Sequence, residues 1–305
     1  MNPVIAVEGL CKSYGSLQAV DDVSFEVRQG EMFGLSGPDG AGKSTIYRIL
    51  ATITSPDSGK AEVLGMDVTR DYRRIRTRIG YMPDRFSLYQ DLSIMENLNF
   101  FALIFGVSVK ANYDLIAPVF GQLEKFPHRK AGALSGGMKQ KLALCCALIH
   151  RPEILLLDEP TTGVDAVSRS EFWDMLATLK DQGISILVST SYMDEATRCE
   201  RISIIDKGRL LDTGTPAGLT SRLGDNLYHA VARDMFGLLN RLRALPGVED
   251  CYTFGATLHV VGNDGFDPGE AEQRLRSDGL ADVRIYPATG DIEDLFIKLT
   301  TRQRQ

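Results

Sequence analysis

A glycine-rich stretch at residues 37–45, GPDGAGKST, carries the clearest chemistry in this chain of 305 residues. It completes the pattern GxxxxGK[ST] between a strand-like segment, MFGLS, and a helix-like segment, TIYRILAT. In that setting backbone N–H groups surround phosphate oxygens, Lys43 reaches the β and γ phosphates, and Ser44 ligates Mg²⁺. The residues expected to contact the nucleotide are Gly37, Pro38, Asp39, Gly40, Ala41, Gly42, Lys43, Ser44 and Thr45. The structural alternative is a glycine turn that only caps a helix, and a chance match to the pattern arises on the order of once in a hundred such chains.

Two carboxylates, Asp158 and Glu159, follow the apolar run at residues 154–157, which is typical of a buried strand. Open α/β sheets place their ligands at the carboxyl ends of such strands. We expect Asp158 to hold Mg²⁺ and Glu159 to polarise the attacking water as general base. An apolar strand that ends in two acids is often structural, but together with a phosphate loop it predicts hydrolysis of ATP.

The composition argues against several other function classes. The chain has 34 Lys and Arg against 40 Asp and Glu, so no global positive field would attract nucleic acid. Its five cysteines form no CxxC pair and have no histidine cluster nearby, which favours a reduced, cytosolic chain over a zinc site or a disulfide framework. The longest apolar stretches are too short to cross a bilayer, and the N-terminus has no signal-peptide pattern. Any membrane role is therefore expected to depend on a partner.

The segments around these motifs predict an α/β fold with a mainly parallel sheet. Residues 1–70 alternate apolar and polar positions, which indicates strands, and residues 71–130 show helical spacing, which indicates a helical insertion. Beyond residue 130, short apolar strands alternate with amphipathic helices, as in a parallel sheet covered on both faces.

After Gly224 the pattern changes to strand, helix, two strands, helix, strand and a last helix from Ile292. This order is close to a split βαβ, ferredoxin-like unit of the α+β class. We therefore expect two domains: an ATP-binding domain at residues 1–222, with a helical subdomain at about 85–150, and a small accessory domain at residues 223–305.

Residues 134–140, LSGGMKQ, lie between the phosphate loop and the paired carboxylates, and with this stretch the chain resembles the ATP-binding subunits of ABC transporters over about residues 3–220. The resemblance implies a P-loop NTPase fold of the ABC-ATPase type, with an antiparallel β subdomain and a helical subdomain beside the parallel sheet. It also implies a head-to-tail dimer with a second ATP-binding subunit. In that dimer Ser135, Gly136 and Gly137 would bind the γ phosphate held by the partner's phosphate loop.

Further positions are interpreted through the same resemblance. Tyr14 resembles the aromatic residue that stacks on adenine, although a lone tyrosine near a strand end is as often core or surface filler. Residues 162–165 resemble the loop that couples the two ATP sites of the dimer. Where the family usually has a glutamine near Mg²⁺, this chain has Asp84, which can still coordinate the metal but adds a negative charge beside the phosphates.

Ser191 stands where the family usually has a histidine that holds the γ phosphate and the attacking water. Its short hydroxyl is not expected to span the same gap, and losing such a donor costs roughly 10² to 10³ in rate. The expected catalytic set is then Glu159, Lys43 and Ser191, in a slow site. The alternative is that a neighbouring residue, or a rotated Ser191, takes the place of the histidine.

The segments MPDRFSLYQDLSIMENL, TTGVDAVSR, VSTSYMDEA and IEDLFIKLT resemble the ATPases of type 2 ABC exporters, the drug and multidrug efflux branch, and within it the degenerate half of paired ATPase modules. The resemblance implies an energising ATPase with ATP and Mg²⁺ as cofactors. It also implies attachment to the cytoplasmic face of the inner (plasma) membrane through transmembrane permease subunits.

Two other functions stay open. One is a weakly hydrolysing subunit that supports hydrolysis at the site of a partner ATPase by lending Ser135 and Gly137. The other is a soluble ABC ATPase of DNA repair or translation, which usually carries two fused nucleotide domains or long coiled insertions that this chain lacks. Homodimer and heterodimer are both compatible with the sequence, and no particular transported substrate is predicted because the substrate pathway would lie in the permease.

Overall fold

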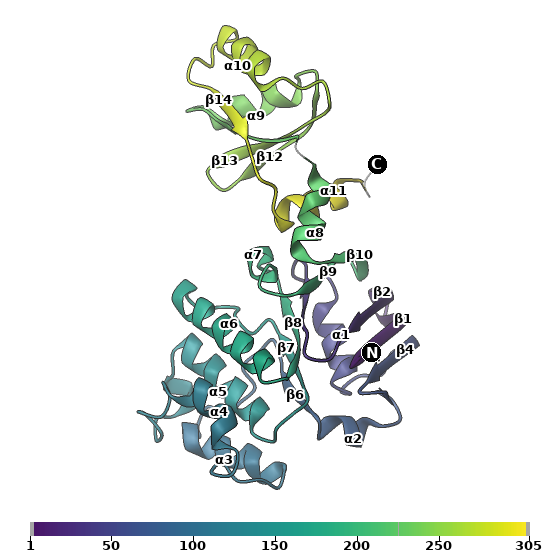
Figure 1. The fold of residues 1–305 in the computed structure, drawn as a ribbon, viewed down its shortest axis with the longest axis vertical. Coiled ribbons are helices and arrows are strands. Elements are labelled where there is room, and N and C mark those ends of the chain that lie inside the picture. Colours follow the sequence, from purple (N-terminus) through teal and green to yellow (C-terminus); the bar gives the residue numbers. More distant parts are fainter. Residues whose placement is uncertain (1–2, 225, 303–305) are drawn as a thin grey trace. The chain divides into compact units, whose positions relative to one another are not determined.

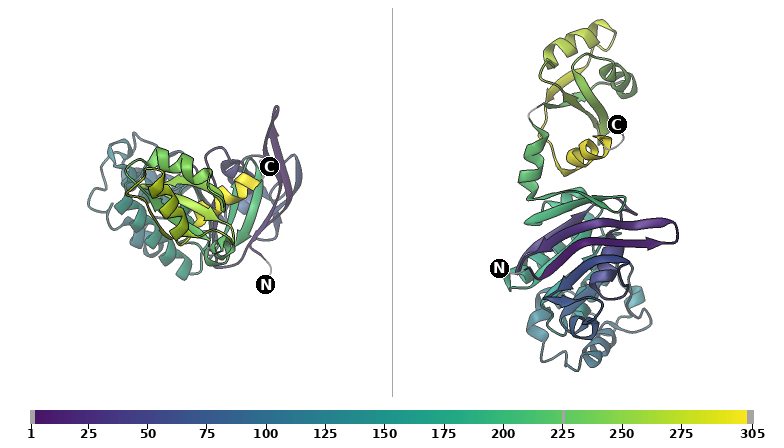
Figure 2. Two further views of the ribbon diagram at one scale, coloured as in Figure 1. Left: turned by 90° about the horizontal axis from the view of Figure 1, so that it is seen from above. Right: turned by 90° about the vertical axis from the view of Figure 1, so that its right-hand side faces the viewer.

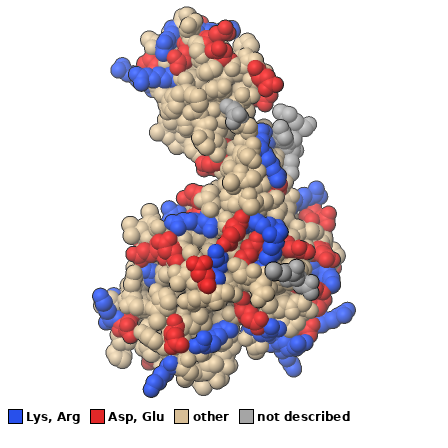
Figure 3. Space-filling model, in the orientation of Figure 1, with Lys and Arg blue, Asp and Glu red and all other residues tan. Residues whose placement is uncertain are grey.

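The computed structural model describes residues 3–224 and 226–302, and its contacts divide the chain into two compact units, Met1–Pro216 and Ala217–Gln305 (Figure 1). The sequence prediction places the domain boundary between residues 222 and 223. Each unit has its own cluster of buried apolar side chains. Lys, Arg, Asp and Glu side chains are interspersed over the face in Figure 3, in keeping with the modest net charge of −6.

The N-terminal unit begins with an antiparallel sheet in the strand order β2-β1-β4-β5. Its strands are β1 (Ile5–Tyr14), β2 (Leu17–Val27), β4 (Ser58–Val63) and β5 (Met66–Asp67). On β2, Val23, Phe25 and Val27 are buried while the residues between them are exposed, so the alternation in the sequence sets the buried face. Figure 2 shows β1 and β2 as a long hairpin. Tyr14 is the last residue of β1, next to the turn of this hairpin.

The central sheet has the strand order β10-β9-β3-β8-β7-β6. Its strands are β3 (Met32–Ser36), β6 (Ile79–Met82), β7 (Ile154–Asp158), β8 (Ser185–Thr190), β9 (Arg201–Asp206) and β10 (Arg209–Gly214). Neighbouring strands from β9 to β6 are parallel, and β10 pairs with β9 in the antiparallel sense. Every residue of β3, β7 and β8 is buried, as expected for strands covered on both faces. The predicted mainly parallel sheet is confirmed.

The helices of the described N-terminal unit are α1 (Lys43–Leu50), α2 (Tyr72–Arg76), α3 (Ile94–Ile104), α4 (Tyr113–Phe120), α5 (Gly136–Leu148), α6 (Ala166–Asp181) and α7 (Met193–Ala196), and α8 (Pro216–Thr220) leads into the second unit. Helix α1 contributes Ile46 and Leu50 to the core shared with β1, β2 and β7. Helices α3, α4 and α5 lie side by side in Figure 1 and form the helical part of the unit.

The prediction of a continuous helical insertion over residues 71–130 is wrong at one element. Residues 79–82 form β6, an edge strand of the central sheet that pairs with β7. Four residues are too few for periodicity to separate a strand from a helix. Tertiary packing also acts on this segment. It lies so close to α5 that a Cβ atom on Gly80 would be 2.4 Å from the Ala147 carbonyl oxygen.

The second unit contains an antiparallel sheet in the order β12-β13-β11-β14. Its elements are β11 (Leu227–Val231), α9 (Met235–Arg243), β12 (Val248–Phe254), β13 (Thr257–Gly262), α10 (Pro268–Ser277), β14 (Arg284–Pro287) and α11 (Ile292–Arg302). Leu238 and Leu242 of α9 and Leu275 of α10 pack against the sheet. On α11, the buried Asp294 accepts hydrogen bonds from Tyr252 Oη and His259 Nδ1. The chain order and strand order are those of a ferredoxin-like unit, as predicted.

Candidate functional site

The loop at residues 37–42 joins the end of β3 to the start of α1, and close backbone contacts require two of its glycines. A Cβ atom on Gly37 would lie 2.1 Å from the Ile205 carbonyl oxygen, and one on Gly42 would lie 2.2 Å from the Ala19 carbonyl oxygen. Gly42 also has φ of 105°, in the left-handed region that favours glycine. The loop therefore leads directly into the positive end of α1, which suits an anion.

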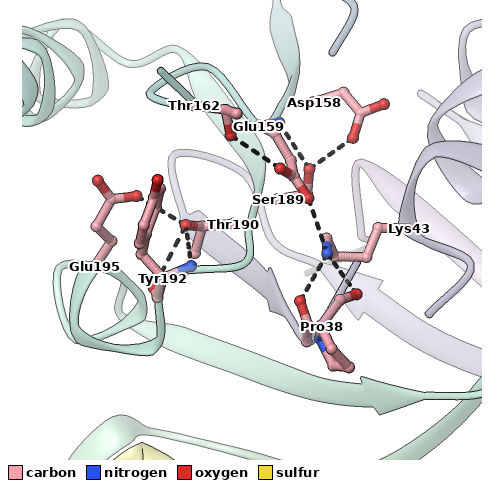
Figure 4. A network of polar contacts seen from close by, with 10 residues as sticks. Pro38, Lys43, Asp158, Glu159, Thr162, Ser189, Thr190, Tyr192 and Glu195 are labelled. Carbon is pink, nitrogen blue, oxygen red and sulfur yellow. Dashed lines mark hydrogen bonds and ion pairs between the residues drawn. The ribbon is translucent and has the colours of Figure 1, made fainter. Parts of the chain in front are cut away.

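Lys43 brings the phosphate loop into contact with the end of β7 (Figure 4). Its ammonium group donates to the carbonyl oxygens of Gly37 at 2.6 Å and Pro38 at 3.0 Å, and it lies 2.9 Å from Glu159 Oε1. Glu159 has φ of 49°, which is uncommon for a residue with a side chain. Its other carboxylate oxygen accepts a hydrogen bond from Thr162 Oγ1 at 2.9 Å. Two residues predicted to be catalytic, 116 positions apart, are thus in direct contact.

Ser189 of β8 joins the two predicted acids (Figure 4). Its hydroxyl donates to Asp158 Oδ1 at 2.7 Å and accepts a hydrogen bond from the Glu159 amide at 2.9 Å. Burial raises the pKa of Asp158, and the carboxylates of Asp84 and Glu159 add to this shift, while hydrogen bonds from Ser189 and Ser44 oppose it. Ser189 was missed in the sequence, although a serine inside a fully buried strand is a usable signal, since buried hydroxyls need partners.

The donor set around Asp158 fits a magnesium ion. Asp158 Oδ2 is buried and has no hydrogen-bond partner among the described residues, and the Ser44 side chain acts on the same carboxylate by lowering its pKa. Carboxylate and hydroxyl oxygens are ligands that Mg²⁺ accepts. Within residues 3–224 and 226–302, no group of three or more His, Cys, Asp or Glu side chains is placed to hold a metal by itself. The phosphates of a nucleotide, or water, would therefore have to supply further ligands.

A cavity of about 380 Å³ opens over the phosphate loop. It is lined by Tyr14, Leu17, Gln18, Ala19, Gly40, Ala41, Gly42, Lys43, Ser44, Thr45, Glu159 and Lys207. The end of β1 thus places Tyr14, with 45% of its surface exposed, in the same cavity as Lys43 and Glu159. Gly37, Pro38 and Asp39 lie outside the lining. Lys207, in the turn between β9 and β10, was missed because its sequence context is that of an ordinary turn.

The LSGG stretch lies at the start of α5 and does not line this cavity. Ser135 is the N-cap residue, and its hydroxyl accepts a hydrogen bond from the Met138 amide at 3.4 Å. A Cβ atom on Gly136 would lie 3.1 Å from the Gly163 carbonyl oxygen, and one on Gly137 would lie 2.8 Å from the Ser168 side chain. The stretch therefore packs closely against the segment that follows Glu159.

Asp84 and Ser191, the two positions that the sequence predicts to weaken the site, lie outside the lining of the cavity. Asp84 follows β6, and its Oδ1 atom is 3.9 Å from Arg48 Nη2. Ser191 directly follows β8 and is half-buried. The preceding residue, Thr190, donates its hydroxyl to the buried Glu195 at 2.7 Å, which fixes the end of β8 next to Ser191 (Figure 4).

Comparison with known proteins gives the family of this site. The family model described as "ABC transporter" matches residues 20–162. The chain is also 37% identical over 298 residues to the Nod factor export ATP-binding protein I of Paraburkholderia xenovorans (strain LB400), and 96% of each chain is covered. The chain belongs to the family of ABC transporter ATP-binding proteins.

A second relative of this ABC ATP-binding protein is the probable multidrug ABC transporter ATP-binding protein YbhF of Escherichia coli (strain K12). The two are 39% identical over 305 residues, which cover 97% of this chain but 52% of YbhF, so the chain spans about half the length of that relative. No helix in the described part of the chain is long and apolar enough to cross a membrane.

Solved structures agree with the ABC-type ATPase fold. The chain matches an ATP-binding subunit of an ABC transporter with a TM-score of 0.66 and 28% identity, over 72% of this chain and 93% of the other. It also matches the dimeric bacterial cassette MJ0796 with a TM-score of 0.63 at 24% identity, over 69% of this chain and 98% of the other, a likeness of fold.

Proposed function

We propose that this ABC ATP-binding protein hydrolyses ATP to drive export through separate membrane subunits. The observation that carries the proposal is the 2.9 Å contact of Lys43 with Glu159 inside the cavity that Tyr14 also lines. It unites the cation of a phosphate loop with the acid best placed to activate water. The two relatives support export, since one is described as a Nod factor export protein and the other as a probable multidrug transporter protein.

Nucleotide binding falls to the loop, Lys43 and Tyr14. The loop's N–H groups and the Lys43 ammonium group bind the β and γ phosphates, which are anionic. The half-exposed Tyr14 ring lines the same cavity and stacks on adenine. Lys207 lines the same cavity and adds a second positive charge for the phosphates.

Hydrolysis falls to Glu159 and the residues that hold it. Ser44 and Asp158 would hold Mg²⁺, which would offset the charge on the phosphates. Glu159 takes a proton from the attacking water as general base. The Thr162 hydroxyl orients its carboxylate, and the bond from its own amide to Ser189 fixes its backbone.

The second ATP-binding subunit is the first partner. Ser135, Gly136 and Gly137 lie outside the chain's own nucleotide cavity, so a helix N-terminus suited to an anion has no phosphate to bind within this chain. A head-to-tail dimer brings a partner's γ phosphate to these residues. Solved cassettes of this fold include a dimer, that of MJ0796.

The membrane permease is the second partner, and it places the protein at the cytoplasmic face of the inner membrane. A groove of about 350 Å³ lies between the segment after β6 and helices α3 and α5. Its apolar lining includes Pro83, Phe86, Leu88, Phe101, Ile104, Phe105, Ala143 and Ala147, with Arg76 and Arg85 as its charged residues. A short apolar segment with an acidic flank fits this lining. Two residues that line the groove, Pro83 and Arg85, flank Asp84 in the sequence. A movement of the segment after β6 would therefore link the groove to the nucleotide site.

A slow site of this chain's own is the second candidate function, and Asp84 and Ser191 favour it. Serine has a shorter reach than histidine and stays neutral, so it stabilises the charge that develops on the γ phosphate less well. In a heterodimer the chain would hold ATP with little turnover and lend Ser135 and Gly137 to the active site of its partner.

The test compares steady-state ATP hydrolysis by the purified chain alone and after reconstitution with the permease and any second ATPase encoded beside it. We expect MgATP binding by the chain alone, with turnover that Glu159→Gln abolishes. For the slow-site candidate, Ser191→His should raise the rate of a homodimer by about 10²-fold, the reverse of losing one transition-state donor. Brisk turnover that Ser191→His leaves unchanged would refute the slow site, and absence of MgATP binding would refute the proposed function itself.

A further inference from the structure

Asp84 is held by a residue of the phosphate-loop helix. Its carboxylate lies 3.9 Å from the guanidinium group of Arg48, which stands in the last turn of α1. Burial raises the pKa of the nearby Tyr81 in β6, and the Arg48 guanidinium group opposes that shift. This pair links the helix that begins at Lys43 to the segment that connects β6 with the apolar groove.

Asp84 lies near Asp158, because it comes two residues after Met82 of β6, and Met82 pairs with Leu157, the residue before Asp158. Its carboxylate acts on the buried Asp158, whose pKa it helps to raise. A free carboxylate at this place would repel the phosphates of ATP, most strongly when no Mg²⁺ lies between them. A guanidinium group beside it offsets that charge and leaves the pair close to neutral.

We propose that Arg48 is a positioning residue of the nucleotide site, which holds Asp84 and offsets its charge so that an acid at this place does not oppose the binding of ATP. In this role Arg48 does not touch the nucleotide, and it acts on the phosphates only by offsetting the charge of Asp84. The role rests on the proposed ATP-binding function, because it acts on the affinity of that same cavity.

The experiment measures the Kd of the full chain for a fluorescent ATP analogue, mant-ATP, with Mg²⁺ and with EDTA. The variants are Arg48→Gln, Arg48→Lys, Asp84→Gln and the double variant Arg48→Gln/Asp84→Gln, and Lys43→Ala serves as the control for the phosphate loop. Thermal unfolding of each variant checks that it is folded.

We expect Arg48→Gln to raise the Kd about fivefold in EDTA, the upper range for a partly exposed ion pair, and less than about twofold with Mg²⁺. Arg48→Lys should bind like the wild type because it keeps the charge. In the double variant the effect in EDTA should disappear. A purely structural role of Arg48 would weaken binding equally in both conditions and would not depend on Asp84.

Equal losses with and without Mg²⁺, or the same loss in the Asp84→Gln background, would overturn the role of Arg48. If Arg48→Gln does not fold, Asp84→Gln alone decides: it should change the Kd in EDTA less than about twofold, and a fivefold gain in affinity would mean that the charge of Asp84 is not offset. If the wild type binds mant-ATP no better than Lys43→Ala, the proposed ATP-binding function fails instead.

Discussion

Replacing Ser189 with alanine removes the hydroxyl that joins Asp158 to Glu159. Ser189 is fully buried, donates to the charged Asp158 at 2.7 Å and accepts from the Glu159 amide at 2.9 Å. Oδ2 of Asp158 already lacks a hydrogen-bond partner among the described residues, and the variant also removes the serine hydroxyl from Oδ1. Losing one bond to a charged group and one neutral bond costs about 2–4 kcal/mol of unfolding free energy.

The matched control is Ser185→Ala on the same strand. Ser185 is equally buried, but its hydroxyl accepts one neutral bond, from the Gly30 amide at 2.9 Å. Its removal should cost about 0.5–1.5 kcal/mol. In a unit of this size each kcal/mol lowers the melting temperature by roughly 2–4 °C, so thermal unfolding followed by circular dichroism separates the two variants.

The pH dependence of this loss has a definite sign. Burial raises the pKa of Asp158 in the folded chain. The charge of this carboxylate therefore opposes folding more and more as pH rises from the pKa of an ordinary aspartate to the pKa in the folded chain. Ser189→Ala removes a bond that lowers this pKa, so the pKa rises further. The difference from the wild type should therefore be largest at neutral pH and shrink towards pH 4. An equal loss for both serine variants, or a loss that grows on acidification, would refute the reasoning.

Three other predictions follow from single contacts. Gly42→Ala should abolish ATP binding, since its Cβ would meet the Ala19 carbonyl oxygen at 2.2 Å, whereas Gly65→Ala, with φ of 68° and open space, should cost about 1 kcal/mol of stability and leave the Kd for ATP unchanged. Tyr14→Ala should weaken ATP binding about tenfold while Tyr14→Phe does not, and the affinity for tripolyphosphate should stay the same in both; equal losses for tripolyphosphate would exclude adenine stacking. Asp294→Asn should destabilise the second unit by about 2–4 kcal/mol, because it weakens the buried bonds from Tyr252 and His259, and exposed Glu249→Gln is the control. Limited proteolysis of residues 217–305 measures that loss of stability. A changed Kd for ATP would contradict an effect confined to the second unit.

Local sequence patterns were sufficient for the parts of the fold that have strong signals. The alternation on β2, the apolar runs of β7 and β8 and the glycine pattern before α1 each depend on a short stretch of chain, and the structure has the corresponding elements. Strand β6 was missed because its four residues become a strand only by pairing with β7, a contact between residues 75 positions apart.

The residues of the candidate site divide in the same way, into those with a local sequence signal and those placed by tertiary contacts. Phosphate-loop residues and the pair Asp158–Glu159 were predicted from motifs, whereas the bridge formed by Ser189 and the pairing of Asp84 with Arg48 depend on which strands and helices become neighbours. Lys207 had no signal at all, since it reaches the cavity only through the packing of the turn after β9. Motifs thus predicted the candidate residues for the chemistry, and tertiary contacts decided which residues lie against them.

The close packing of Gly136 on Gly163 bears on which amino-acid substitutions such a chain can accept. A Cβ atom on Gly136 would lie 3.1 Å from the Gly163 carbonyl oxygen, so the LSGG stretch packs closely on the backbone of the loop that follows Glu159. The side chains of Asp84 and Ser191 take no part in this packing. A change of side chain at either position would therefore leave the spacing between the LSGG stretch and the loop after Glu159 unchanged.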